Sequence, residues 1–239
     1  MSDVVSDDEG ELLFSYRGCT VRIDAGVQSP KAGSLLFCRH LDVRPGDRVL
    51  EVGSGAGLAA VLLARAGAHV IATDIRPEAV ACTRQNAARN GAADRVDVRL
   101  GDGFAPVAGL RFDLICTSPP QMPTPPGRER DDAEAAADNG GPDGWALLDP
   151  VIRQAPAHLT PGGRLVFTLF AFLGIERARR TLRAAGLEPA VVAREPQPFP
   201  RIGYERLDYL RTVDTEGTIP RDALPRTVDR YVVAGRRPA

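Results

Sequence analysis

The sequence predicts an α/β fold in which helices cover both faces of a doubly wound, mostly parallel sheet. From residue 48 onward, short runs of β-branched and aliphatic residues alternate with longer runs of helical periodicity. The first predicted strand leads into Gly53, Gly55 and Gly57, directly before a helix. Asp74 comes at the end of the next apolar run, His69 to Thr73. Strand, glycine turn, helix and carboxylate in this order are typical of a sheet that binds a nucleoside at its carboxyl edge.

The predicted elements follow one another along the chain. Strands are predicted at 48–52, 69–73, 95–100, 112–117, 164–169, 188–193 and 231–234. Helices are predicted at 57–66, 77–90, 145–158 and 174–185. Pro77 suits a first helical turn, and Asn90-Gly91 supplies the stop. Pro161-Gly162-Gly163 predicts a tight turn before the fifth strand.

Three segments interrupt this alternation, and we expect a single domain, 1–239, that carries them as covers or insertions. The N-terminal cover segment, 1–46, shows a helical pattern only from Ala32 to His40. The first cover segment is 121–144, and the second is 194–228. Both later segments leave strands at the carboxyl edge, where ligands bind in open parallel sheets. We expect them to cover a substrate, with tolerated surface loops as the alternative.

Composition limits the class of protein. A hydrophobic content of 44% can fill a core, and no run approaches the ~20 apolar residues of a membrane span. The acidic N-terminus lacks signal-peptide features, which predicts a cytoplasmic location and no membrane partner. Cysteines and histidines are scattered, so no metal site is expected. A net charge of −1 offers no general attraction to nucleic acid. The oligomeric state stays open.

The glycine turn carries most of the chemical information. Glycines let the backbone approach a ligand closely, and the following helix directs free N–H groups into the same space. A carboxylate at Asp74 can accept hydrogen bonds from both hydroxyls of a ribose. Leu58 follows Gly57 directly, so the pattern differs from the dinucleotide fingerprint G-x-G-x-x-G. A tight structural turn is the alternative explanation for the glycines alone.

Glu51-x-Gly53-x-Gly55-x-Gly57 resembles the first motif of class I S-adenosylmethionine-dependent methyltransferases. The resemblance implies a Rossmann-like seven-stranded sheet whose last strand is antiparallel, and S-adenosyl-L-methionine as cofactor. It also implies that Asp102 binds the adenine amino group and that Phe104 bounds the ring. The cofactor contacts implied in this way are Glu51, Gly53, Ser54, Gly55, Gly57, Asp74, Ile75, Asp102, Gly103, Ser118 and Lys31.

The strand 112–117 runs into Ser118-Pro119-Pro120, which resembles the Asp/Asn/Ser-Pro-Pro-aromatic motif of amino-methyltransferases. Successive prolines hold the preceding carbonyls in a fixed direction. By this resemblance these three residues form the catalytic motif, in which Ser118 and the Pro119 carbonyl orient the target nitrogen. Gln121 stands at the aromatic position, where its amide can hydrogen-bond to the substrate instead.

Two further stretches, Asp24 to Lys31 and Asn139 to Gly144, resemble the release-factor glutamine methyltransferases and the related "small" methyltransferase group. The resemblance runs from about residue 20 to 193. It implies that a proline-containing stretch, here Pro30, Lys31 and Ser34, folds over the cofactor. It also implies a helical N-terminal domain that grips a protein substrate, for which 46 residues are too few.

The leading hypothesis is therefore a methyltransferase acting on a nitrogen or oxygen of a small-molecule acceptor, in specialised metabolism. Phe199 and Tyr204, in the second cover segment, are expected to bind that acceptor, with packing on the protein's own surface as the competing explanation. The first alternative is a macromolecular methyltransferase acting on a protein glutamine or an RNA or DNA base. The second is a nucleotide-binding module without catalysis, which would not require Ser118-Pro119-Pro120.

Overall fold

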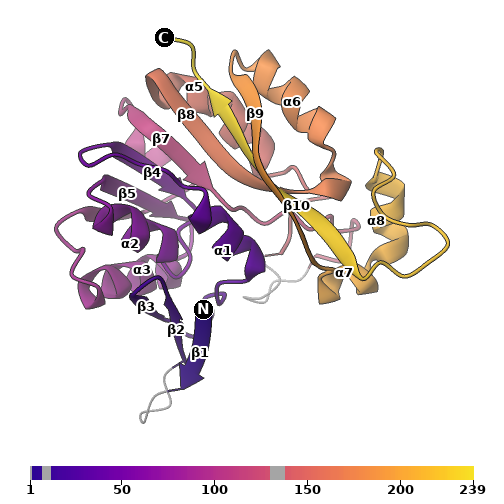
Figure 1. Cartoon of the computed structure of the whole chain (residues 1–239), viewed down its shortest axis with the longest axis horizontal. Helices are drawn as coiled ribbons and strands as arrows, with labels where there is room; N and C mark the ends of the chain where they lie inside the picture. Colours follow the sequence, from indigo (N-terminus) through magenta and orange to yellow (C-terminus); the bar gives the residue numbers. More distant parts are fainter. Residues whose placement is uncertain (1, 7–11, 130–137) are drawn as a thin grey trace.

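A seven-stranded sheet dominates the computed structural model, which describes residues 2–6, 12–129 and 138–239 (Figure 1). Six strands run in the same direction, and β10 is antiparallel to both of its neighbours. This arrangement confirms the predicted doubly wound fold with an antiparallel last strand. In spatial order the strands are β6 (Val96–Leu100), β5 (His69–Asp74), β4 (Arg48–Val52), β7 (Phe112–Thr117), β8 (Leu159–Phe170), β10 (Thr227–Arg236) and β9 (Glu188–Pro198).

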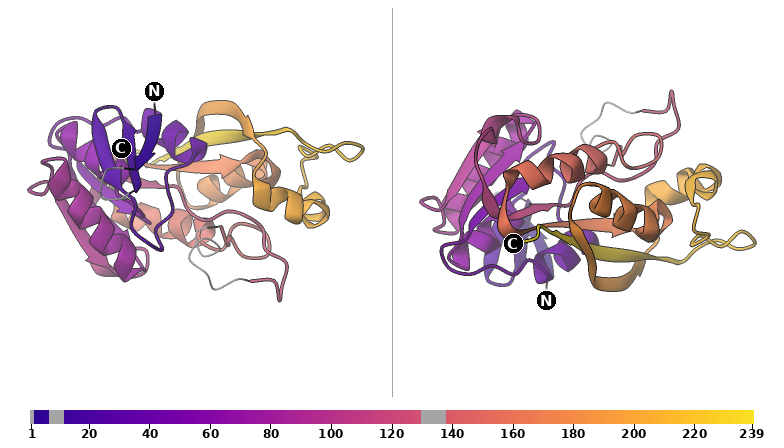
Figure 2. Two further views of the ribbon diagram at one scale, coloured as in Figure 1. Left: turned by 90° about the horizontal axis from the view of Figure 1, so that it is seen from below. Right: turned by 90° about the horizontal axis from the view of Figure 1, so that it is seen from above.

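Helices cover both faces of the sheet, as the two views of Figure 2 show. One face packs against α1 (Ala32–Arg39), α2 (Leu58–Arg65) and α3 (Pro77–Arg89), and the other against α5 (Leu148–His158) and α6 (Ile175–Ala184). The central strand β7 serves both cores, because Leu114 and Cys116 face the first layer while Ile115 faces the second. Burial on both faces explains why this strand is continuously apolar.

The N-terminal cover segment contains a small antiparallel sheet that sequence analysis did not predict. Its strands are β1 (Ser2–Ser6), β2 (Leu12–Tyr16) and β3 (Cys19–Arg22). Asn86 of α3 joins this sheet to the glycine turn. Its side-chain amide donates hydrogen bonds to the carbonyls of Arg22 (2.8 Å) and Ala56 (2.9 Å), and its oxygen accepts one from the Arg22 N–H (2.8 Å). The helix expected from Ala32 is confirmed as α1.

The later strands are longer than predicted. The turn at 161–163 lies inside β8, where the pairing with β7 jumps from Phe112–Leu159 to Leu114–Arg164. The second cover segment is less irregular than expected, because β9 and β10 extend into it as an antiparallel ribbon. Two short helices, α7 (Arg201–Glu205) and α8 (Leu207–Val213), follow β9 (Figure 1). Prolines fit in β9 because it is the edge strand of the sheet.

The strand register aligns the ends that matter for function. Val52 at the end of β4 pairs with Thr73 of β5 and Thr117 of β7, and Asp74 pairs with Leu100 of β6. The glycine turn, Asp74, the Asp102 turn and the Ser-Pro-Pro motif therefore start at one edge of the sheet. Among the described residues, no helix has the length and apolar character that a membrane span needs.

Candidate active site

The three glycines after β4 have different physical reasons to be glycine. All three have left-handed backbones, with φ of 79°, 55° and 78° at Gly53, Gly55 and Gly57. A Cβ on Gly53 or Gly55 would meet nothing within 4 Å, whereas one on Gly57 would lie 2.8 Å from a methyl group of Thr83. The first two glycines thus leave open space for a ligand, and the third allows α2 to pack on α3. The buried Ser54 hydroxyl also lies 3.0 Å from that of Thr83, so its side chain is turned away from the expected cofactor.

Asp74 supports the glycine turn directly. One carboxylate oxygen accepts a hydrogen bond from the Gly55 N–H (3.0 Å), and the other accepts one from the Arg76 N–H (3.0 Å). A carboxylate offers about four acceptor positions, so two remain for the hydroxyls of a ribose. The structure therefore adds a role in shaping the turn to the predicted role in cofactor binding.

Glu51 lies beneath the turn with a buried carboxyl group. Burial raises its pKa to about 8, an effect opposed by a hydrogen bond from the Ala60 N–H and reinforced by the negative charge of Asp74. Its Oε2 atom has no hydrogen-bond partner among the described residues. S-adenosylmethionine carries an α-ammonium group, and an unsatisfied carboxyl oxygen can accept a hydrogen bond from such a donor. The residues at this edge thus fit the cofactor.

The raised pKa of Glu51 predicts how stability depends on pH. The folded protein holds this proton up to about pH 8, while the unfolded chain releases it near 4.5. The free energy of unfolding therefore falls as pH rises through this window. We expect Glu51→Gln to remove that fall and to melt higher than the parent at pH 8, by about 2–4 °C for each kcal/mol gained. Melting curves across this pH range test it, with the exposed Asp94→Asn as control; parallel profiles for parent and Glu51→Gln would contradict it.

The adenine side of the predicted site contains two exposed apolar side chains. Ile75 and Leu100 are 66% and 55% exposed, and they flank the paired ends of β5 and β6. Asp102 is exposed two residues after Leu100, and the carbonyl of Gly103 accepts a hydrogen bond from Thr73 (3.1 Å). Sequence analysis missed Leu100, although its place at the end of a strand beside Asp102 could have indicated it.

Phe104 does not take the role that the resemblance implied. Its ring is buried in the core and stacks on His158, with ring centroids 4.7 Å apart. The Phe104 ring packs in the core under the turn that follows β6, and its surface is not accessible to an adenine ring.

The Ser-Pro-Pro motif lies beside the glycine turn. The Thr117 hydroxyl donates to the carbonyl of Val52 (2.7 Å), which ties the end of β7 to the end of β4. Ser118 follows immediately, half-buried, with its Oγ atom 3.0 Å from the Thr168 hydroxyl of β8. Pro119 is buried and Pro120 half-buried. The motif is therefore anchored on strands at both sides, as its predicted role in orienting an acceptor requires.

Gln121 is not available to a substrate, contrary to expectation. It is 2% exposed, and its amide nitrogen donates to the backbone carbonyl of Thr168. Its amide oxygen accepts a hydrogen bond from the Phe170 N–H (3.3 Å). Both ends of the amide are thus bound to the backbone of β8. Gln121 fixes the end of that strand against the Ser-Pro-Pro motif and does not bind the acceptor.

The first cover segment folds back on this motif. Residues 130–137 lie outside the described part of the chain. The two ends of the segment bind each other. The Gly140 N–H donates to the carbonyl of Met122 (2.9 Å), and the Thr124 N–H donates to the carbonyl of Gly141 (2.9 Å). A Cβ on Gly140 would lie 2.6 Å from the backbone of Gln121, so only glycine permits this approach. The segment therefore folds back on its own first residues, which directly follow the Ser-Pro-Pro motif.

The three cover segments meet here. The exposed Lys31 at the start of α1 pairs with Asp138 at 3.7 Å. From the second cover segment, the buried guanidinium of Arg206 donates to the carbonyl of Pro123 (3.2 Å) and the hydroxyl of Thr124 (2.8 Å). These contacts hold the covers together around the end of β7.

The two aromatic residues of the second cover segment differ in exposure. Phe199 is 5% exposed and packs edge-on against Tyr204, with ring centroids 5.0 Å apart. It belongs to the hydrophobic core, so the competing explanation is right for this residue. Tyr204 remains exposed, and its hydroxyl donates to the carbonyl of Pro225 (2.7 Å).

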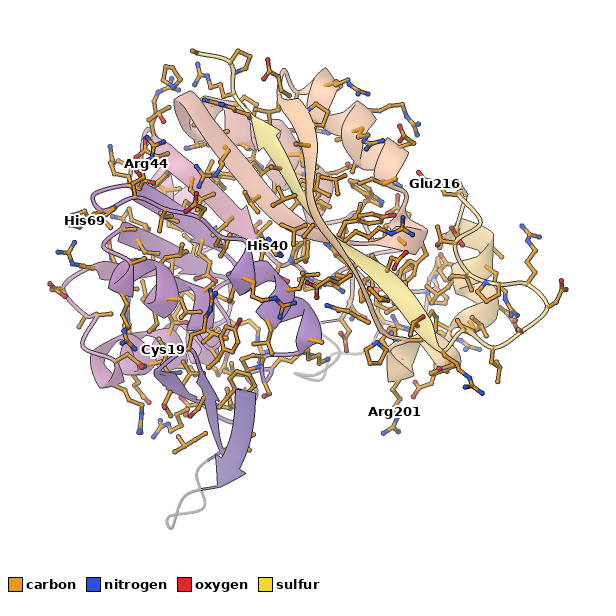
Figure 3. The ribbon with its side chains drawn as sticks, in the orientation of Figure 1. Cys19, His40, Arg44, His69, Arg201 and Glu216 are labelled. Carbon is orange, nitrogen blue, oxygen red and sulfur yellow. The ribbon has the colours of Figure 1, made fainter. Side chains whose placement is uncertain are left out.

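Metal-ligating side chains do not gather in the described residues. No three His, Cys, Asp or Glu side chains come together there in a way that could hold a metal ion. Figure 3 shows Cys19, His40 and His69 on separate parts of the fold, and all four cysteines are buried free thiols.

A seven-stranded sheet of this strand order, with β10 antiparallel between β8 and β9, is the fold of the class I S-adenosylmethionine-dependent methyltransferases. Residues 18–126 match the family described as "Methyltransferase small domain". The chain belongs to this family and is related to the release factor glutamine methyltransferases. It is an S-adenosylmethionine-dependent methyltransferase.

Two relatives and one solved structure illustrate the relationship. A release factor glutamine methyltransferase of Cereibacter sphaeroides is 37% identical over 186 residues, which span 74% of this chain and 65% of that enzyme. A candidate protein N5-glutamine methyltransferase of Methanocaldococcus jannaschii is 30% identical over 190 residues, which span 79% of this chain and 94% of that protein. The Mtq2–Trm112 complex of E. cuniculi, described as responsible for methylating the termination factor eRF1, matches with a TM-score of 0.60 and 15% identity, over 89% of this chain and 99% of that one.

Proposed function

We propose that this chain transfers a methyl group from S-adenosylmethionine to the side-chain amide nitrogen of a glutamine in a protein of the translation machinery. The observation that carries the proposal is the Ser118-Pro119-Pro120 motif beside the glycine turn, in a chain whose relatives are named for glutamine methylation. The relatives favour this alternative over the small-molecule acceptor that the sequence suggested first.

The main task of the protein in this reaction is to align the acceptor nitrogen with the methyl group of the cofactor. When bound, the cofactor would supply a methyl group already activated by the sulfonium, whose sulfur leaves as the neutral thioether of S-adenosylhomocysteine. Ser118 and the Pro119 carbonyl orient the acceptor amide so that its nitrogen lies in line with the methyl–sulfur bond, an effect of proximity and orientation. Gln121 and Thr117 keep that motif in place through their bonds to β8 and β4. The packed cover segments exclude water from the reacting atoms.

A protein acceptor also suits the surface around this edge. Tyr204 and Leu224 of the second cover segment are exposed, and such apolar side chains can pack on a protein substrate. Recognition of the substrate by this segment is part of the proposal.

Methylation of a release factor tests the proposal. The chain is incubated with methyl-labelled S-adenosylmethionine and the purified release factor of its own organism. We expect label in the factor, a mass increase of one methyl group on a single glutamine, and none when that glutamine is replaced by asparagine. Ser118→Ala should reduce the labelling by about 10-fold or more, as expected for loss of one orienting hydrogen bond.

A parallel experiment with fractionated cell extract separates the other interpretations. Label that enters only the fraction below the size cut-off would contradict the proposal and favour the small-molecule acceptor. Label that enters RNA or DNA would favour the nucleic-acid acceptor.

A further inference from the structure

An arginine lies where the pattern of β10 calls for an apolar residue. Arg230 faces the same layer as Val232, which packs in the core beneath α1. It is 8% exposed, and a Cβ on Gly33 of α1 would lie 3.2 Å from its guanidinium carbon. The guanidinium stacks on the Phe170 ring, 3.7 Å from the centroid. Because residue 33 has no side chain, the guanidinium of Arg230 fits between α1 and the sheet.

Arg230 begins a chain of hydrogen bonds that ends at the catalytic motif. Its Nη2 atom donates to the hydroxyl of Thr168 (3.2 Å), whose oxygen lies 3.0 Å from Oγ of Ser118. Thr168 is fully buried, and its hydroxyl proton needs an acceptor. The guanidinium of Arg230 can only donate hydrogen bonds. Within this series of hydrogen bonds, the oxygen of Ser118 is therefore the group that accepts the Thr168 proton. The proton of Ser118 is then free to point toward the acceptor substrate.

The charge of Arg230 is poorly balanced. Its buried Nε atom has no partner among the described residues, and no carboxylate there forms an ion pair with it. The negative charge that acts on it most is that of Asp138, which already pairs with Lys31. Burial lowers the pKa of Arg230 to about 9, which leaves it charged at neutral pH. A cationic acceptor would be repelled here, whereas a neutral one would not.

We propose that Arg230 acts through Thr168 to hold Ser118 as a hydrogen-bond donor, and that this donor recognises the oxygen of a neutral carboxamide. The inference rests on the proposed function and deepens it. Ser118 donates to the carboxamide oxygen while the Pro119 carbonyl accepts from its nitrogen, so the pair matches both ends of a glutamine side chain. A glutamate carboxylate would lack the N–H group, and a lysine ammonium would lack the oxygen. Arg230 and Thr168 are positioning residues for this selection.

Substitutions in the chain test the proposal with the release factor as substrate. We expect Thr168→Val and Arg230→Met each to lower kcat/KM about 10- to 100-fold while the cofactor Kd changes less than about twofold. Thr168→Ser, which keeps the hydroxyl, should stay near the parent. The double variant should be no slower than Thr168→Val alone, because both changes break one chain. Arg194→Met, at an exposed arginine of β9, is the matched control.

Thermal stability separates this role from a structural one. Removal of an unpaired buried cation should leave the Tm of Arg230→Met unchanged or higher, although turnover falls. Single and double variants that turn over at the parental rate would overturn the proposal. The proposal would also be overturned if the losses in kcat/KM of the two single variants multiplied in the double variant. The same holds if the loss in kcat/KM of each variant followed its fall in Tm.

A small probe makes the test independent of the release factor. Ligand-detected NMR measures the binding of N-acetylglutamine methylamide and of its glutamate and lysine counterparts. The protein is saturated with S-adenosylhomocysteine in each measurement. We expect the parent to prefer the glutamine probe and Thr168→Val to lose that preference. If the probe behaves so while the factor is not methylated, only the proposed protein substrate fails. If the parent binds the three probes equally, the carboxamide selection fails.

Discussion

Asp74→Ala is expected to weaken S-adenosylmethionine binding by about 100-fold or more while the sheet remains folded. The carboxylate is expected to accept bonds from two ribose hydroxyls, and each charge-assisted bond contributes about 1.5–3 kcal/mol before coupling. The same carboxylate also holds the N–H groups of Gly55 and Arg76, so the variant loses the shape of the turn as well. Calorimetric titration gives the affinity, and circular dichroism checks the fold.

Two further variants make this result interpretable. Asp74→Asn keeps the size and one acceptor oxygen, so it should lie between the parent and Asp74→Ala. Asp97→Ala removes an exposed carboxylate from the neighbouring strand β6, where it pairs with Arg99, and should leave the affinity unchanged. A folded Asp74→Ala protein with parental affinity would refute the assignment of the ribose site.

Gly140→Ala is expected to lower methyl transfer by more than about 100-fold while cofactor binding persists. The added Cβ would lie 2.6 Å from the backbone of Gln121 and 2.9 Å from that of Gly144, and backbone cannot yield as a flexible side chain can. The backbone of Gln121, which directly follows the Ser-Pro-Pro motif, must then shift, and a misplacement of about 1 Å in such a site costs about 100-fold.

The matched control lies in the same segment. A Cβ on Gly127 would meet nothing within 4 Å, so Gly127→Ala adds only the strain of its left-handed backbone, φ 78°. We expect it to retain most of the parental turnover. Single-turnover kinetics and cofactor titration on both variants separate the acceptor step from cofactor binding. Equal rates for Gly140→Ala and the parent would show that this contact does not position the motif.

The parts of the fold that sequence predicted are those with local causes. Apolar runs that end in glycine, such as β4 before Gly53, identify the parallel strands because both of their faces are buried. The small N-terminal sheet escaped prediction because it is held by Asn86 of the distant helix α3 and by Asn90 directly after that helix. Prolines in 194–198 suggested a loop, but an edge strand tolerates them.

The candidate site divides in the same way. Asp74 and the glycine turn follow from spacing along the chain, because strand, turn and helix are consecutive. The roles of Gln121, Thr168 and Arg230 depend on which strands pair across the sheet, and Arg230 meets Phe170 only through the register of β10 with β8. Such contacts join residues far apart in sequence, and no local pattern encodes them.

The position of Asn86 links the N-terminal sheet to the cofactor energetically. One side-chain amide holds the carbonyls of both Arg22 in β3 and Ala56 in the glycine turn. Opening of the small sheet therefore releases a support of the turn, and a ligand that requires the ordered turn opposes that opening by mass action. Amide hydrogen exchange in β3 should slow when S-adenosylmethionine is added, although this strand does not adjoin the glycine turn in sequence. The amide exchange rates of the N-terminal strands would thus report whether the enzyme has its cofactor bound.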